Sequence, residues 1–360
     1  METIRAAVCR AFNEDFTIEQ VNLRDPVAGE VKVKIAACAV CHSDITFHNG
    51  GWPAPLPAVY GHEAAGHVTA VGEGVHDLEL GDPVLVTLVR ACGSCPACVT
   101  AHPATCEKPG MAPDGPITLP DGSPVFHGLN AAAFAESAVI SRSQVVKIPA
   151  DMPMDAASLI SCGVITGVGA AVNTAEIRPG QDVVVIGAGG VGLNAIQGAR
   201  IAGARRIVAV DLNPDKLEIA KEFGATDGVV GEGKPWNAVK ALLGGRGADV
   251  VLVAVGVAAV YDVAPRYLAS GGKMVVVGLP HAGAASSYQA LAVGTGGQTF
   301  KGSYMGDVVL ARDVPWIVDL YQQGRLKLDE LISGRWTLDQ INEAFADTKS
   351  GAARRNVITF

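Results

Sequence analysis

Basic residues are in deficit in this sequence. Lysine and arginine number 28 against 36 aspartates and glutamates, which gives a formal net charge of −8 at pH 7. Phosphate backbones select basic surfaces, so this balance argues against a nucleic acid partner. Residues 1–5 lack the apolar core of a signal peptide, and the longest strongly apolar run, residues 250–261, is too short to cross a bilayer. We therefore expect a cytoplasmic protein that binds neither nucleic acid nor a membrane.

Signs of an oxidising compartment are also missing. The chain has 8 cysteines among 360 residues. In a small secreted protein such a count suggests disulfides, but in a long chain without a signal the cysteines more often bind metal or stay reduced. Hydrophobic residues make up 49% of the sequence, which is ample for a large core. A single core stops growing well below this length, so we expect two domains.

Metal-binding residue types gather in two short stretches, Cys41-His42-Ser43-Asp44 and Gly61-His62-Glu63. Cys41 and His62 are zinc-binding residue types, and Ser43 is placed to pass a proton beside them. A tetrahedral site needs a further ligand, and Cys162 is the one cysteine after position 106. Two cysteines and one histidine, with a fourth position left for water or substrate, are typical of a catalytic zinc site.

Four more cysteines lie close together in the sequence: Cys92, Cys95, Cys98 and Cys106. Their spacing suits a tetrahedral Zn–S4 site without an open position, which predicts a structural zinc. An iron–sulfur cluster is the competing interpretation, but its usual spacing ends in a three-residue gap, and the gap here is seven. Disulfides are the third interpretation and need an oxidising compartment, for which nothing in the sequence argues.

A dinucleotide-binding pattern follows Cys162. Residues 182–186 form an aliphatic strand, and Gly187-Ala188-Gly189-Gly190-Val191-Gly192 then fits G-x-G-x-x-G at the start of a helix expected over 190–202. The glycines permit a tight turn and let pyrophosphate approach the helix N-terminus. Asp211 ends the next strand, where its carboxylate would accept from ribose hydroxyls and repel a 2′-phosphate; Lys216 lies one turn further on. The pattern favours NAD over NADP, and a purely structural glycine turn is the alternative.

The remaining segments predict two kinds of structure. The N-terminal part is β-rich, with strands expected over 4–12, 16–23, 30–37, 64–71 and 84–88, and residues 103–128 are interpreted as a long surface loop. Alternating strands and helices after the glycine motif, with further strands over 249–255 and 273–278, indicate a doubly wound parallel sheet. The tail is expected to return to the first domain through helices over 315–323 and 337–348, a Thr337–Gln340 capping box and a strand over 356–360.

The other cysteines and histidines have plainer interpretations. Cys9 and Cys38 lie in apolar strands and are predicted to be core residues. Apart from His62, most histidines are expected on the surface or in loops: His67, His76, His102, His127 and His281.

Taken together, these motifs make the whole chain resemble the zinc-dependent medium-chain alcohol dehydrogenases, and the closing residues 355–360 resemble that family as well. The resemblance implies a Rossmann doubly wound parallel sheet inserted into a GroES-like β-barrel catalytic domain. Residues 1–163 and 305–360 would form the catalytic domain with its structural-zinc lobe, and residues 164–304 would form the NAD-binding domain. It also implies two zinc ions per subunit, NAD, and a homodimer or homotetramer.

The same resemblance implies a role for each site residue. Cys41, His62 and Cys162 would hold the catalytic zinc, and Cys92, Cys95, Cys98 and Cys106 the structural one. Asp44 would orient His62, Glu63 would be the nearby carboxylate that can approach the metal, and Ser43 would take the alcohol proton. The cofactor contacts would be Gly187, Gly189, Gly190, Val191, Gly192, Asp211, Lys216, Thr166 and Val277, with His42 and Arg355 on the phosphates. The substrate pocket would be lined by Trp52, Leu88, Leu279 and Tyr304.

The sequence departs from the family pattern at two places. Thr46 stands where many members have the histidine that ends the proton relay, and His48 is the candidate to replace it. Residues 103–128, with Pro113-Asp114-Gly115, resemble the glutathione-dependent formaldehyde dehydrogenase branch. However, Gly110 and Trp52 replace the arginine and the acidic pocket residue of that branch.

The expected function is therefore reversible, zinc-dependent oxidation of a primary alcohol, medium-chain or aromatic, to the aldehyde, with hydride transfer to NAD. Trp52 and Leu88 suggest the apolar pocket that such an alcohol needs. The alternatives are an S-(hydroxymethyl)glutathione dehydrogenase, a zinc-free reductase of the same superfamily, and a non-catalytic NAD- or zinc-binding scaffold.

Overall fold

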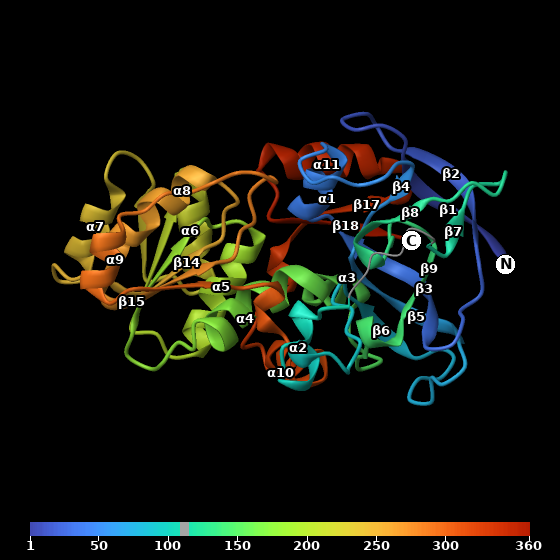
Figure 1. The fold of residues 1–360 in the computed structure, drawn as a ribbon, viewed down its shortest axis with the longest axis horizontal. Helices are drawn as coiled ribbons and strands as arrows, with labels where there is room; N and C mark the ends of the chain where they lie inside the picture. Colours follow the sequence, from blue (N-terminus) through green and yellow to red (C-terminus); the bar gives the residue numbers. More distant parts are fainter. Residues whose placement is uncertain (109–114) are drawn as a thin grey trace. The chain divides into compact units, whose positions relative to one another are not determined.

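A computed structural model describes residues 1–108 and 115–360 of the chain (Figure 1). The predicted features at Gly110 and Pro113-Asp114 lie outside the described residues. The chain forms two compact units. The first combines Met1–Cys162 with Val309–Phe360, and the second is Gly163–Val308.

Two sheets form the framework of the first unit. The five-stranded sheet has the order β7-β2-β1-β4-β8, with β1 (Glu2–Cys9), β2 (Thr17–Leu23), β4 (Ala58–Val59), β7 (Ile117–Thr118) and β8 (Phe126–His127). The other has the order β10-β6-β5-β3-β18-β17, with β9 also paired to β3. Its strands are β3 (Glu30–Ala39), β5 (Glu63–Val71), β6 (Pro83–Val86), β9 (Ser137–Ser141), β10 (Val145–Lys147), β17 (Ile332–Thr337) and β18 (Arg355–Thr359).

The C-terminal strand β18 returns to the first unit, as predicted. It pairs antiparallel to β3, with Val357 opposite Ala39, and parallel to β17. The predicted capping box of Thr337 and Gln340 is present and leads into α11 (Ile341–Ser350). The preceding helix, α10 (Leu310–Gln322), begins before the predicted residue 315.

The part of segment 103–128 that follows residue 114 contains strands rather than the predicted surface loop. Its strands β7 and β8 join the five-stranded sheet, and residues Ile117, Leu119, Val125 and Phe126 are buried. The strands are only two residues long, so proline and glycine dominate the local pattern and hide them from a search for periodicity. Burial in the tertiary structure, rather than local propensity, makes these strands.

The second unit is a parallel six-stranded sheet of order β13-β12-β11-β14-β15-β16, as the alternating pattern predicted. Its strands are β11 (Asp182–Ile186), β12 (Arg206–Asp211), β13 (Asp227–Val230), β14 (Ala248–Val253), β15 (Leu268–Val276) and β16 (Thr299–Gly302). The connecting helices are α5 (Gly190–Ile201), α6 (Pro214–Glu222), α7 (Pro235–Leu242), α8 (Ala258–Val263) and α9 (Ala290–Gly296). Strand order reverses between β11 and β14, and nucleotides bind at such a switch point.

One long helix was not predicted. Residues Met154–Thr174 run through α3 (Met154–Leu159), a π-helical turn at Ile160–Val164, α4 (Ile165–Gly169) and a second such turn at Ala170–Thr174. By length and composition it could cross a membrane, but 89% of its most apolar window is buried inside the structure, as in a core helix. Buried on all sides, it has no amphipathic period, and its serines, threonines and glycines interrupt the apolar run.

Candidate active site

Cys41 and His62 are brought together by the start of a short helix. Cys41 is the N-cap of α1 (His42–His48), and Asp44 occupies the third helical position. The Asp44 carboxylate accepts from the Cys41 backbone N–H at 3.1 Å through Oδ2. Its Oδ1 accepts from the Gly61 N–H at 3.0 Å and contacts His62 Nδ1 at 3.1 Å. A single fully buried carboxylate thus caps the helix and holds the histidine ring, as expected for the residue that orients a metal-binding imidazole.

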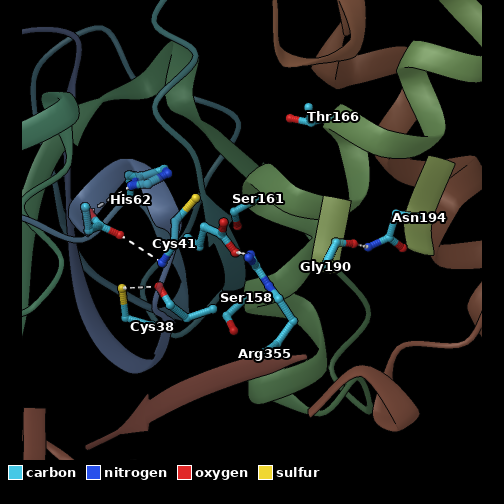
Figure 2. A network of polar contacts seen from close by, with 12 residues as sticks. Cys38, Cys41, His62, Ser158, Ser161, Thr166, Gly190, Asn194 and Arg355 are labelled. Carbon is cyan, nitrogen blue, oxygen red and sulfur yellow. Dashed lines mark hydrogen bonds and ion pairs between the residues drawn. The ribbon is translucent and has the colours of Figure 1, made fainter. Parts of the chain in front are cut away.

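Four potential metal ligands converge at this point. The ligand atoms of Cys41, His62, Glu63 and Cys162 all lie within 4.8 Å of one another, and all four residues are buried. Cys162 belongs to the first π-helical turn of the long helix, and the adjacent Ser161 hydroxyl donates to the Ala64 carbonyl of β5 at 2.9 Å. Figure 2 shows Cys41, His62 and Ser161 in this arrangement. The wide turn and its serine anchor bring Cys162 to the start of β5.

The donor set fits a zinc ion. Because Asp44 engages Nδ1, the other ring nitrogen of His62 is left as the ligand atom, and Nε2 has no hydrogen-bond partner among the described residues. A buried nitrogen without a partner is costly unless a ligand satisfies it. Two thiols and one imidazole within this span are the ligands of a catalytic zinc with one open position.

The electrostatics of the cluster favour thiolate formation at Cys41. A hydrogen bond from Cys162 lowers the pKa of the Cys41 thiol well below its usual range, and His62 and Arg355 act in the same direction. Burial alone would lower the pKa of His62, but the neighbouring Asp44 carboxylate raises it well above the usual value. Zinc binding needs a thiolate, so the lowered pKa of Cys41 favours a metal ion, whereas His62 must lose a proton to become a ligand.

Glu63 and Arg355 form a buried ion pair beside the thiols. Burial raises the pKa of Glu63 to about 8, against the opposing effect of Arg355. Its Oε1 has no partner among the described residues. Both are predicted site residues, but the sequence does not predict their pairing, because 292 positions separate them and no local pattern links them. Arg355 lies at the start of β18, so the return of the tail to β3 delivers it (Figure 2).

The four cysteines of the second cluster also converge. The Cys92 and Cys98 sulfurs are 4.0 Å apart, and those of Cys95 and Cys106 are 3.8 Å apart. Backbone N–H groups point at the sulfurs, among them Ser94 N–H to Cys92 at 3.4 Å and Cys92 N–H to Cys106 at 3.3 Å. Hydrogen bonds from Ser94 and from the Cys95 N–H lower the pKa of Cys92 to about 5, and the Ser94 N–H is the largest cause. Four sulfurs with N–H support fit a closed tetrahedral Zn–S4 site.

The glycine motif has the geometry of a nucleotide-binding turn. Gly187 has a φ of +96°, and a side chain there would meet Val255 at 2.4 Å. A Cβ on Gly192 would lie 1.8 Å from the Gly187 carbonyl oxygen, whereas one on Gly189 would meet nothing within 4 Å. The first and last glycines are therefore required by the turn, and the middle one keeps open space where a pyrophosphate can approach. Figure 2 also shows Asn194 bonded to the Gly190 carbonyl, at 2.8 Å.

Asp211 lies beside this turn, at the end of β12. Its carboxylate accepts from the Ala188 N–H at 2.8 Å and from the Asn213 N–H at 3.0 Å. Lys216 is partly buried in α6. A carboxylate at this position is the group that distinguishes a ribose hydroxyl from a ribose phosphate.

The other predicted site residues have varied environments. Ser43 is partly buried in the first turn of α1, and His42 is exposed beside it. Thr166 and Val277 are buried, Thr166 with its hydroxyl 3.7 Å from the Met305 sulfur, and Leu279 and Tyr304 are exposed. Leu88 is buried after β6, and Trp52 packs edge-on against Phe47 at 5.3 Å between ring centroids.

His48 is the last residue of α1, and contacts with neighbouring segments fix its ring. Its Nε2 lies 2.7 Å from the Glu14 carbonyl oxygen, and its ring stacks on Phe16 at 4.8 Å and packs against Phe345. Thr46 turns its hydroxyl back to the His42 carbonyl at 2.9 Å. These contacts assign the His48 ring a packing role, and its part in a proton relay stays a prediction.

Two interpretations of the other polar residues can now be judged. Cys9 and Cys38 are fully buried, as predicted. The prediction for His127 was wrong: the residue lies in β8, is only 9% exposed, and burial lowers the pKa of its imidazole to about 4. The strand that buries it is the one the sequence pattern missed.

Comparisons with known proteins agree with this geometry. The model of the alcohol dehydrogenase GroES-like domain matches residues 27–150, and that of the zinc-binding dehydrogenase domain matches residues 190–323. The chain is 37% identical over 98% of its length to the class-3 alcohol dehydrogenase of Myxine glutinosa, 97% of which is covered. This chain belongs to the zinc-dependent medium-chain alcohol dehydrogenases. It is an NAD-dependent zinc alcohol dehydrogenase by family, built from a GroES-like domain and a Rossmann sheet.

Solved structures of this family superpose closely. An alcohol dehydrogenase zinc-binding domain protein from Burkholderia ambifaria is 36% identical with a TM-score of 0.95, covering 100% of this chain and 99% of that one. The benzyl alcohol dehydrogenase of Acinetobacter calcoaceticus is 32% identical with a TM-score of 0.94, and both chains are covered completely. The architecture with its Rossmann sheet is therefore shared over the whole length.

Proposed function

We propose that this protein oxidises primary alcohols, medium-chain or aromatic, to aldehydes and uses NAD as the hydride acceptor. The observation that carries the proposal is the buried convergence of Cys41, His62 and Cys162 within 4.8 Å. Beside them lies Glu63 Oε1, which has no hydrogen-bond partner among the described residues. A non-catalytic scaffold has no need of three ligands that leave a fourth position open. A zinc-free reductase has no need of them either.

In this proposal Cys41, His62 and Cys162 hold the catalytic zinc. Zinc bound there supplies a Lewis acid that polarises the alcohol oxygen and eases loss of its proton. Asp44 keeps the His62 ring oriented through the 3.1 Å contact at Nδ1. Ser43, in the first turn of α1, accepts the alcohol proton and passes it outward.

The glycine turn and Asp211 bind the cofactor. Gly187, Gly189, Gly190, Val191 and Gly192 form the pyrophosphate turn, Asp211 and Lys216 bind the adenosine ribose, and Thr166 and Val277 flank the nicotinamide. His42 and Arg355 are proposed to contact the phosphates, and Arg355 is meanwhile paired with Glu63. NAD supplies the hydride acceptor. A second zinc is held by Cys92, Cys95, Cys98 and Cys106.

An aromatic wall supports the choice of substrate. Trp52 packs on Phe47, which in turn stacks on Tyr60 at 5.8 Å between centroids. Leu88 is apolar and buried. We propose that Trp52 and Leu88, with Leu279 and Tyr304, line a pocket for an apolar or aromatic alcohol. That a relative at 32% identity is a benzyl alcohol dehydrogenase supports an aromatic substrate.

We also propose that the protein is cytoplasmic and forms a homodimer or a homotetramer. The cysteines of the described residues are all free of disulfides, which suits a reducing compartment.

The test is NADH formation by purified, zinc-replete protein with NAD and a panel of alcohols. The panel runs ethanol, hexanol, benzyl alcohol and formaldehyde, the last with and without glutathione. Turnover of free alcohols that a strong chelator or Cys41→Ala abolishes would support the proposal. Bound zinc and NAD without turnover of any substrate would contradict it and favour the scaffold.

Oxidation of the glutathione adduct of formaldehyde is the second candidate. The segment after Cys106 favours it, because its length resembles that branch of the family. The aromatic contact of Trp52 argues against it, since an acidic residue is expected at that position. Turnover of formaldehyde only in the presence of glutathione would establish this candidate over the first.

A further inference from the structure

Two backbone segments, residues 86–88 and 128–134, flank the potential metal ligands in the first unit. Strand β6 pairs with β5 so that Val86 lies opposite Ala64, the residue after Glu63. Thr87 and Leu88 follow directly, and Thr87 is fully buried. The first segment therefore leaves the sheet beside His62 and Glu63 and ends in Leu88, a proposed wall of the pocket.

The second segment, residues 128–134, is attached to the residues that precede His62. The Ala133 N–H donates to the Gly61 carbonyl at 2.9 Å, and the Phe134 N–H donates to the Tyr60 carbonyl at 2.9 Å. Within it Leu129, Asn130 and Ala132 have φ values of +52°, +57° and +49°. Left-handed backbone at a residue other than glycine is unfavourable and persists only where its surroundings enforce it. Something must hold this segment in place.

Gln144 connects the two segments. Its side-chain amide nitrogen donates to the Thr87 carbonyl at 2.8 Å and to the Asn130 carbonyl at 3.0 Å. The backbone carbonyl of Gln144 in turn accepts a hydrogen bond from the Thr87 N–H at 3.0 Å. The side chain is 1% exposed, so water cannot replace these bonds. An uncharged amide with two N–H donors matches two backbone carbonyls without burying a charge.

We propose that Gln144 is a positioning residue that sets the shape of the alcohol pocket by fixing Leu88 and the segment that contains the strained Leu129, Asn130 and Ala132 beside the potential metal ligands. The inference rests on the proposed function. The Gln144 side-chain amide donates to Thr87 and Asn130 and not to the predicted metal ligands or the glycine motif, so it would act through the two segments. Its loss should change which alcohols are accepted while leaving metal and cofactor binding intact.

The test compares the full-length protein with Gln144→Met, which keeps the length of the side chain and removes both donors. We expect the ratio of kcat/KM for benzyl alcohol to that for ethanol to change at least tenfold, mainly through KM for benzyl alcohol. Zinc content and the Kd for NADH should stay within twofold of the wild type. Gln144→Asn, which keeps the amide on a shorter stem, provides a milder variant if the first does not fold, with a smaller change in the same direction.

The control is Asn342→Leu, which removes another amide that joins two segments. Asn342 accepts from the Phe16 N–H at 2.9 Å and donates to the Phe16 carbonyl at 3.1 Å. It should lower Tm while leaving the benzyl-to-ethanol ratio within twofold. An unchanged ratio in both Gln144 variants, with lowered Tm, would make Gln144 merely structural and overturn the inference. Absence of alcohol turnover by the wild type would instead overturn the proposed function.

Discussion

The two carboxylate oxygens of Asp44 contact three hydrogen-bond donors, so one side chain both stabilises the local fold and orients a predicted metal ligand. It receives the N–H groups of Cys41 and Gly61 and the Nδ1 atom of His62. Asp44→Asn keeps the shape but turns an N–H toward one of these donors. Residues that orient a metal-binding histidine contribute about 10–100-fold to metal affinity. We predict a loss of that size at the catalytic zinc, measured by competition with a coloured chelator.

The matched control for this variant is Asp313→Asn. Asp313 is also a buried carboxylate that caps a helix, since it accepts from the Val309 N–H at 2.9 Å. It is predicted to lower Tm without weakening zinc binding. Equal zinc affinity in the Asp44 variant and the wild type would show that Asp44 only caps α1.

His127 makes stability depend on pH. Burial lowers the pKa of its imidazole from 6.5 to about 4, so between these values the unfolded chain binds a proton that the folded chain excludes. The free energy of unfolding must therefore fall as the pH drops from 6.5 to 4, by up to about 1.4 kcal/mol per pH unit for this one group. Urea titrations of His127→Gln should show a shallower fall than the wild type. Exposed His67→Gln is the control, and equal slopes in all three proteins would refute the assignment.

At the scale of elements, the lobe that carries the four cysteines has little core of its own, so we expect a bound metal to stabilise it. Its helix α2 (Pro96–Val99) is four residues long, and none of them is buried. We predict that Cys95→Ser lowers the zinc content from two ions per chain to one and opens residues 92–106 to proteolysis. Elemental analysis and limited proteolysis measure the two effects. Cys9→Ala, at a buried cysteine of the core, should keep both ions, and two zinc ions in Cys95→Ser would argue against a Zn–S4 site.

Elements with a strong local signal could be predicted, and those made by tertiary contacts could not. Strand β11 and helix α5 follow from an aliphatic run and the glycines after it, because a parallel strand buried on both faces has an unbroken pattern. Strands β7 and β8 are too short to show a period. The turn that carries Cys162 is part of a helix without an amphipathic face. The zinc ligands could be identified from residue type, but their convergence could not.

At the scale of the whole molecule, the predicted metal-binding and cofactor-binding motifs lie in different units. Cys41, His62 and Cys162 belong to the first unit, whereas the glycine turn belongs to the second. This division explains why the site could be predicted motif by motif, since each motif is local to one unit. The pairing of Glu63 with Arg355 could not, because it depends on the C-terminal strand returning past the whole inserted unit.

Because the glycine turn and the predicted zinc ligands lie in different units, we predict that a substitution can abolish cofactor binding without loss of zinc. A Cβ at Gly189 meets nothing within 4 Å, so Gly189→Ala should leave Tm within about 1 °C of the wild type, while the methyl group occupies space that the pyrophosphate needs. We expect at least a tenfold rise in the Kd for NADH, measured by fluorescence titration, with both zinc ions retained. Gly192→Ala differs, because its Cβ would lie 1.8 Å from the Gly187 carbonyl oxygen, and it should lower Tm as well. Unchanged NADH affinity in Gly189→Ala would mean that the turn does not hold the pyrophosphate, because the substituted position is the one where the structure leaves room for it.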